Sequence, residues 1–218
     1  MAFRDRAEAG RKLAAKLTVY AGRADVTVLA LARGGVPVGH EVAAALGVPL
    51  DVLVVHRLVA PSNHAGSTIG AVAGGGICVV DEQLCEAFNL TPHAVREIAE
   101  RQQADVERRD QIYHGNHAPP DLRGRTVILV DDGMATGASM GAAVRAVLDR
   151  RPAAIIVAVP VASYATCAEL ASTVDEIVYC FIRDPIYAVG LWYERYPPVS
   201  DEEACRLLER THPQAAHG

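Results

Sequence analysis

Aromatic residues are scarce in this chain, at 5% of its 218 residues, whereas half of the residues are hydrophobic. The core must therefore consist mostly of Val, Ala, Leu and Ile, which favours buried parallel strands covered by helices. A basic excess is also lacking, since 21 Lys and Arg stand against 26 Asp and Glu, and the formal net charge is −5. This balance argues against a general nucleic-acid partner or a membrane-surface role on electrostatic grounds.

The sequence contains no C-x-x-C pair and no apolar run of about 18 residues, so neither a zinc ribbon nor a membrane span is expected. Residues 1–6 are charged and lack the apolar stretch of a signal peptide. An odd number of scattered cysteines is typical of reduced thiols. Together these features predict a cytoplasmic protein. The five cysteines are Cys78, Cys85, Cys167, Cys180 and Cys205.

What the sequence does contain is an alternation of apolar runs and amphipathic stretches. This alternation predicts an α/β fold in a single domain over residues 1–218, with right-handed crossovers and a mostly parallel central sheet flanked by helices. We expect strands at 26–31, 50–56, 126–130, 153–159 and 176–181, and a hairpin of 69–73 with 77–80. We expect helices at 3–20, 38–46, 91–113, 136–149, 164–171 and 201–210. The mixed charges of helix 91–113 predict a solvated helix face.

Residues 127–139 read Val-Ile-Leu-Val-Asp-Asp-Gly-Met-Ala-Thr-Gly-Ala-Ser. The apolar run predicts a strand that ends at the carboxyl edge of the sheet, where α/β folds bind ligands. Asp131 and Asp132 are placed there to accept hydrogen bonds from two sugar hydroxyls. The backbone N–H groups of the next residues can turn toward one phosphate at a helix N-terminus. These residues are Gly133, Met134, Ala135, Thr136, Gly137, Ala138 and Ser139.

This segment resembles, over its whole length, the motif with which type I phosphoribosyltransferases bind 5-phosphoribosyl-1-diphosphate (PRPP). A second segment supports the resemblance, because Arg33, Gly34 and Gly35 follow the strand 26–31. In the family a loop at this place holds the pyrophosphate, and the peptide bond before its basic residue, here Ala32–Arg33, can be cis. Glycine lets the backbone approach the anion, and an arginine can bind it through two hydrogen bonds.

The resemblance implies transfer of ribose 5-phosphate from PRPP to a nitrogenous, purine-like base with release of pyrophosphate. It implies that Asp131 and Asp132 hold the ribose hydroxyls, partly through Mg²⁺, while Arg33 and Arg57 contact the pyrophosphate as catalytic groups. Hypoxanthine-type enzymes carry an Asp where this chain has Ala135. No carboxylate that assists the base can therefore be carried over, and a 6-oxopurine is disfavoured.

The base is expected to bind in a small hood, residues 183–199, followed by the helix 201–210. Asp184, Tyr187 and Trp192 are the candidates there, although packing of these aromatics on the sheet is the simpler interpretation. The loop 58–67 would close over PRPP, and His64 within it is interpreted as an ordinary loop histidine. The chain is also similar to bacterial predicted phosphoribosyltransferases of unassigned substrate. The expected partners are PRPP and a base, and a homodimer stays open.

Two alternatives remain. A relative that binds PRPP or a nucleotide for regulation, without catalysis, fits the same motif. A serine hydrolase is suggested by Gly137-Ala138-Ser139-Met140-Gly141, with Asp175 or Asp184 and His212 following in hydrolase order. However, a nucleophile elbow needs its serine at the turn between strand and helix, and Ser139 is expected inside the helix.

Overall fold

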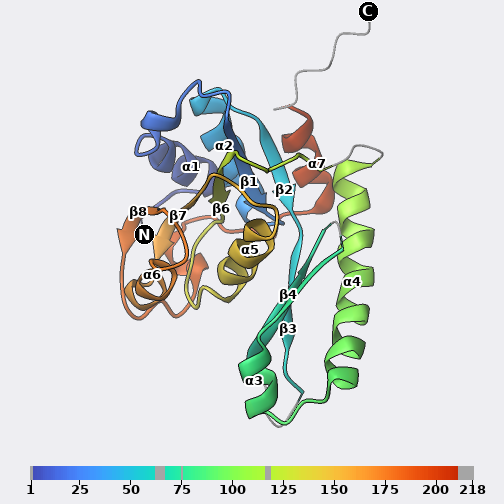
Figure 1. Ribbon diagram of the computed structural model, residues 1–218. Helices are drawn as coiled ribbons and strands as arrows, with labels where there is room; N and C mark the ends of the chain where they lie inside the picture. The colour runs from blue at the N-terminus through green and yellow to red at the C-terminus, as the bar shows by residue number, and fades with distance from the viewer. Residues whose placement is uncertain (1, 62–66, 75, 116–118, 211–218) are drawn as a thin grey trace, which may run out of the picture.

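The computed structural model describes residues 2–61, 67–74, 76–115 and 119–210. Its centre is a five-stranded parallel sheet in the order β2-β1-β6-β7-β8 (Figure 1). The strands are β1 (Val26–Leu31), β2 (Leu50–Leu53), β6 (Thr126–Val130), β7 (Ala154–Ala162) and β8 (Glu176–Ile182). The predicted α/β class and parallel sheet are confirmed.

Helices cover both faces of this sheet. They are needed on both because successive side chains of strand β1 point to opposite faces and all of them are buried. Val28 and Ala30 pack with α1 (Arg6–Ala14), α2 (Gly35–Leu46) and α7 (Asp201–Glu209). Leu29 and Leu31 point to the other face and pack with α5 (Ala138–Leu148) and α6 (Tyr164–Leu170). Every residue of β1 and β6 is buried, which explains why these strands are almost entirely apolar, with Thr27 and Thr126 as the exceptions.

A second, antiparallel sheet in the order β3-β4-β5 projects from the side of the parallel sheet (Figure 1). Its strands are β3 (Val55–Val59), β4 (Thr68–Ala73) and β5 (Ile77–Val80), and it is accompanied by α3 (Glu82–Ala87) and α4 (Pro92–His114). The hairpin of β4 with β5 is confirmed, as is α4, which Thr91 caps by accepting from the Ala94 N–H at 3.2 Å.

The single strand expected at 50–56 is wrong, because the chain changes sheets within it. β2 pairs with β1 as far as Leu53, and β3 pairs with β4 from Val55 onward. The residues around the break, Leu53, Val54 and Val55, are all apolar, so the sequence does not reveal the change. It depends on partners elsewhere, since Ala32 N–H donates to Leu53 O at 3.1 Å and Gly74 N–H donates to Val54 O at 3.2 Å.

Several boundaries also differ from those expected. Helix 3–20 is only α1 plus a 3₁₀ turn, η1 (Thr18–Tyr20), because Asp5 caps α1 by accepting from Glu8 N–H at 2.9 Å. Helix α2 begins at Gly35 and α5 at Ala138, strand β7 runs on to Ala162, and α3 was not predicted. Among the residues described, no helix is long and apolar enough to cross a membrane.

Residues 183–199, the expected hood, run back across the N-terminal segment. They contain the 3₁₀ turn η3 (Val189–Trp192). The N–H groups of Ala2 and Phe3 donate to Trp192 O at 3.0 Å, and Glu194 N–H donates to Phe3 O at 2.9 Å. The Phe3 ring lies 5.4 Å from the Tyr193 ring. The N-terminal segment is thereby fastened to residues 192–194 beside β8, where the Phe3 ring also lies 5.5 Å from the Phe181 ring.

Candidate functional site

The two predicted ligand loops meet at the carboxyl edge of the parallel sheet. Strands β1 and β6 are neighbours in register, with Ala30 opposite Val130, so the segments that follow them emerge side by side. Between them lies a cavity of about 370 Å³. Its lining residues are Arg6, Ala32, Arg33, Gly34, Arg109, Asp131, Asp132, Tyr196, Pro198 and Val199.

Glycine is required in the first loop because the second loop is so close. A Cβ on Gly34 would lie 2.3 Å from Asp132 Oδ2, and one on Gly35 would lie 2.5 Å from Val130 O. Any larger residue at these positions would push the N-terminus of α2 away from the acidic pair. The Ala32–Arg33 peptide bond is cis, as the family resemblance implies.

Asp132 is the most heavily bonded residue at this edge. Its Oδ2 accepts from Arg6 Nε at 2.8 Å and from the Tyr196 hydroxyl at 2.8 Å. Its backbone oxygen accepts from the Tyr193 hydroxyl at 2.6 Å. The Arg6 guanidinium also lies 3.7 Å from the centre of the Tyr196 ring. Asp132 is therefore fixed by α1 and by the segment 193–196, and much of its hydrogen-bonding capacity is used within the protein.

Asp131 is the more available carboxylate of the pair. Its Oδ1 accepts from Asp132 N–H at 2.9 Å, and the residue keeps some exposure to the cavity. Burial, together with the neighbouring charge of Asp132, raises the pKa of Asp131 well above its usual value. A carboxylate in this position gains from any donor or cation that a ligand brings.

Cationic side chains face the two carboxylates across the cavity. Arg33 is partly exposed, and its Nη1 lies 3.9 Å from Asp201 Oδ1 on α7. Arg109 comes from α4, where its Nε lies 3.5 Å from Asp105 Oδ2. The prediction that the charged face of α4 is simply solvated is therefore wrong for Arg109, which lines the cavity. Three guanidinium groups, counting Arg6, give this cavity the character of an anion site.

The loop 133–139 is shaped by contacts with the next strand and helix. Met134 N–H donates to Val161 O at 2.8 Å, and Ser163 N–H donates to Met134 O at 2.9 Å. Gly137 has a φ of +67°, and a Cβ there would lie 2.1 Å from Thr166 Cγ2. Thr166 Oγ1 also donates to Ala135 O at 2.9 Å. The loop is thus held in one conformation before any ligand arrives.

The backbone N–H groups of this loop are free to bind a ligand. Within the described part of the chain, no hydrogen bond uses the N–H groups of residues 135–140, while those of Met134 and Gly141 are both engaged. These free donors run into the N-terminus of α5, which begins at Ala138. Consecutive unpaired N–H groups at a helix N-terminus form an anion site, helped by the helix dipole.

The sequence comparisons agree with this geometry. Residues 3–185 match the model of the phosphoribosyl transferase domain family. The chain belongs to this family. Two curated phosphoribosyl transferase relatives come from Mycobacterium tuberculosis strains CDC 1551 and H37Rv, and both carry the name "Putative phosphoribosyl transferase". Each is 35% identical over 210 residues, which are 96% of this chain and 47% of the relative. The chain therefore spans about half the length of these relatives.

A solved structure resembles the chain over its full length. The crystal structure of TT1426 from Thermus thermophilus superposes with a TM-score of 0.85 at 36% identity, and the match covers 98% of this chain and 100% of that one. The expected type I phosphoribosyltransferase fold, a mostly parallel central sheet flanked by helices, is confirmed, and a small antiparallel sheet accompanies it.

Other predicted residues of this phosphoribosyltransferase domain lie outside the acidic-pair cavity. Arg57 is exposed on β3, on the same sheet face as Val55, which packs toward α5. Arg57 does not line the cavity, so its contact with pyrophosphate stays a prediction. His64 and half of the expected closing loop, residues 62–66, fall outside the described residues.

The three base-binding candidates do not line this cavity either. Asp184 accepts from Ser163 Oγ at 2.6 Å and from Ala165 N–H at 3.2 Å, at the start of α6. Trp192 stacks on Phe181 with ring centres 6.1 Å apart. Tyr187 is 86% exposed. Asp184 and Trp192 thus make structural contacts, and the assignment of this hood to the base stays a prediction.

The hydrolase constellation is not assembled in the described residues. Ser139 lies in the first turn of α5 and not at the preceding turn. Asp175 accepts from Ile155 N–H at 2.8 Å, and Asp184 is engaged by Ser163. His212 lies outside the described residues.

Sequence reasoning missed Arg6, Arg109, Tyr193 and Tyr196. Arg6 and Arg109 belong to runs of mixed charge, and both tyrosines belong to a tail whose aromatics were expected to pack or to bind a base. Nothing local distinguishes these residues from their neighbours. Only contacts across the chain, such as that between residues 6 and 132, give them a role at the site.

Proposed function

We propose that this domain binds PRPP and transfers its ribose 5-phosphate to a nitrogenous, purine-like base, releasing pyrophosphate. One observation carries the proposal: the free N–H groups of residues 135–140 and the open carboxylate of Asp131 border the same sheet edge as Arg33. A phosphate, a diol and a pyrophosphate are the three groups that such an edge accommodates, and PRPP carries all three.

Each part of the donor has a proposed place. The 5-phosphate takes the N–H groups at the start of α5, where the dipole favours a negative charge. The ribose hydroxyls donate to Asp131, with Asp132 behind it as the fixed partner. The pyrophosphate lies toward Arg33 and Arg109, which offset the charge that the leaving group develops. The chain thus works mainly by positioning and by charge stabilisation.

Magnesium fits this donor set. The described residues contain no group of three or more His, Cys, Asp and Glu side chains that could hold a metal ion by themselves. Mg²⁺ is commonly bound by one or two carboxylates together with substrate phosphates and water, and Asp131 offers one such carboxylate. When bound with PRPP, the ion would neutralise charge on the pyrophosphate.

Calorimetric titration with PRPP and Mg²⁺, followed by a pyrophosphate-release assay over a panel of purine and pyrimidine bases, tests the proposal. We expect binding of PRPP and release with at least one base. Binding without release for any base would instead support the regulatory alternative, and absence of binding would contradict the PRPP assignment itself. An ester-hydrolysis assay with Ser139→Ala is the corresponding check on the hydrolase alternative.

A further inference from the structure

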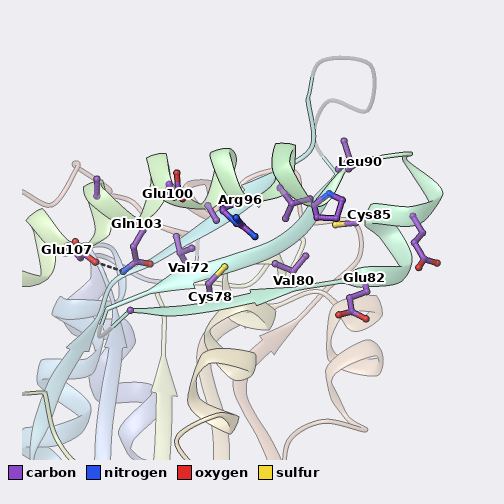
Figure 2. Close-up of a pocket in the computed structure, with 16 residues that line it drawn as sticks. Val72, Cys78, Val80, Glu82, Cys85, Leu90, Arg96, Glu100, Gln103 and Glu107 are labelled. Atoms are coloured by element: carbon purple, nitrogen blue, oxygen red, sulfur yellow. Dashed lines mark hydrogen bonds between the residues drawn. The ribbon is translucent and has the colours of Figure 1, made fainter.

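A second, larger cavity lies away from the carboxyl edge of the parallel sheet, where we place PRPP. Helix α4 packs over the antiparallel sheet through Val106, which contacts a cluster with Leu58 and Ile69. Toward β5 and α3 the helix leaves a cavity of about 900 Å³ (Figure 2). It shares no lining residue with the cavity at Asp131 and Asp132. The two are separate sites on the same molecule.

The walls of this second cavity are mostly apolar. Figure 2 shows Val72, Cys78 and Val80 on the strands facing the side chains of α4 across the opening. Its volume is within the range of about 300–1,000 Å³ that small-molecule sites occupy. The apolar residues of the lining are Val72, Cys78, Val80, Cys85, Leu90, Pro92, Val95, Ala99 and Ala104.

One polar group in the wall lacks its partner. Gln103 Nε2 donates to Glu107 Oε1 at 3.1 Å. A carboxylate can only accept, so the amide must direct its NH₂ group to Glu107 and leave its oxygen on the other side. Gln103 Oε1 is buried and has no donor among the residues that the structure describes. A buried acceptor without a donor costs free energy, and a ligand N–H group would remove that cost once the Gln103 side chain turns its oxygen toward the cavity.

The charges of the lining favour one class of ligand. The lining contains four carboxylates and one guanidinium, all on exposed residues: Glu82, Glu86, Glu100, Glu107 and Arg96. The cavity at Asp131 and Asp132 has a different balance, since three arginines line it beside these two carboxylates. An anion such as a nucleotide is therefore disfavoured in the second cavity, whereas a cation gains from the carboxylates around its rim.

We propose that the cavity between α4 and β5 is a binding site for a small organic cation, an amine or amidine on an apolar framework. The framework fills the apolar walls, one N–H group donates to Gln103 Oε1, and the positive charge lies near Glu100 and Glu107. This site does not depend on the PRPP assignment, because it shares no residue with that edge.

Three probes with one apolar body and different head groups test the chemistry. We expect 4-phenylbutylamine to bind, measured by calorimetry and by chemical-shift changes, more tightly than 4-phenylbutanol and at least about tenfold more tightly than 4-phenylbutyrate, because charge-assisted hydrogen bonds are the stronger ones. Equal affinities for the three probes, or preference for the acid, would overturn the proposal. So would the absence of any binding.

Variants locate the binding. Gln103→Leu removes the unpaired oxygen at nearly constant size, and Glu100→Gln removes one rim charge. Each variant should lower the affinity for the amine several-fold and reduce the ratio of its affinity to that of the alcohol. Glu97→Gln is the matched control, because Glu97 is an exposed residue of α4 outside the lining. Glu97→Gln should bind the amine with the affinity of the parent. If Gln103→Leu and Glu100→Gln also keep that affinity, the cavity is not the binding site.

A second copy of the chain is the competing occupant of this apolar face. Sedimentation equilibrium at rising concentration distinguishes the two. A dimer that Ala99→Arg dissociates, combined with no amine binding, would overturn the proposal in favour of self-association. A mass that stays unchanged with and without the amine, while the amine binds, supports the small-molecule site.

Discussion

Arg6 and Asp132 form a buried ion pair, with Nε and Oδ2 2.8 Å apart, although 126 residues separate them in the chain. Their side chains retain only 9% and 10% exposure. The pair joins the first helix to the loop that follows β6, and the ring of Tyr196 lies against the guanidinium. The proposed PRPP site is therefore built on an interaction between the N-terminal helix and the centre of the sheet.

Replacing Arg6 should destabilise the fold. In Arg6→Met the Asp132 carboxylate stays buried without its cation, which costs about 3–5 kcal/mol in comparable pairs. Urea unfolding would measure the loss in unfolding free energy. Arg4→Met is the control, because Arg4 forms an exposed pair with Asp5 and should change stability by at most about 1 kcal/mol. Similar losses in the two variants would contradict the role of Arg6.

Asp131→Asn and Asp132→Asn should differ in their effects on the stability of the fold. Since burial and the Asp132 charge raise the pKa of Asp131, its ionised form opposes folding above its ordinary pKa, and the neutral amide should preserve or increase stability at pH 7. The same variant should lose PRPP binding. Asp132→Asn should lower stability, because Arg6 loses its counter-ion. The reverse pattern, in thermal unfolding and calorimetry, would refute this division of roles.

The arginines of the cavity should discriminate between two halves of the donor. Arg33→Ala and Arg109→Ala are each expected to weaken pyrophosphate binding far more than ribose 5-phosphate binding, by about 1–3 kcal/mol for a lost charge-assisted contact. Isothermal titration with the two ligands separately provides the comparison. Equal losses for both ligands would contradict the assignment. Arg57→Ala in the same series tests whether β3 contributes.

Gly137→Ala should disturb the phosphate loop. The φ of +67° disfavours any side chain, and the new Cβ would lie 2.1 Å from Thr166 Cγ2. We expect a loss of more than about 1 kcal/mol in stability together with weaker ribose 5-phosphate binding. Gly141→Ala on α5 is the matched control, since its Cβ would meet its first neighbour at 3.9 Å. That variant should be neutral or stabilising, and a loss as large as that of Gly137→Ala would disprove the strain argument.

His114 at the end of α4 should make stability fall in alkali. Burial opposes its charge, but hydrogen bonds to Asp110 and Asp51 outweigh burial and raise its pKa to about 10. A raised folded-state pKa contributes stability that is full below the unfolded value near 6.5 and is lost as the pH rises through about 10. The parent should therefore lose more unfolding free energy between pH 7 and 10.5 than His114→Gln. Parallel profiles would contradict this.

The amino-acid sequence by itself determined the two innermost strands of the site, β1 and β6, and the segments that follow them. Strands β1 and β6 have the expected bounds because they are short, mostly apolar runs bordered by turn residues. Residues 127–139 and Arg33-Gly34-Gly35 could be recognised because the bend, the close approach and the charge that a phosphate needs are encoded within a few neighbouring residues.

Only the tertiary structure decided which distant residues complete the edge. Arg6, Arg109 and Tyr196 come from elements whose local pattern indicates an ordinary helix surface or an aromatic tail. The break between Leu53 and Val55, and the commitment of Asp132 to Arg6, likewise depend on which strand or side chain is adjacent in space. The spacing of apolar residues and the residue types that favour turns are short-range properties of the sequence. Which charges and which strand edges pair is settled by packing across the whole chain.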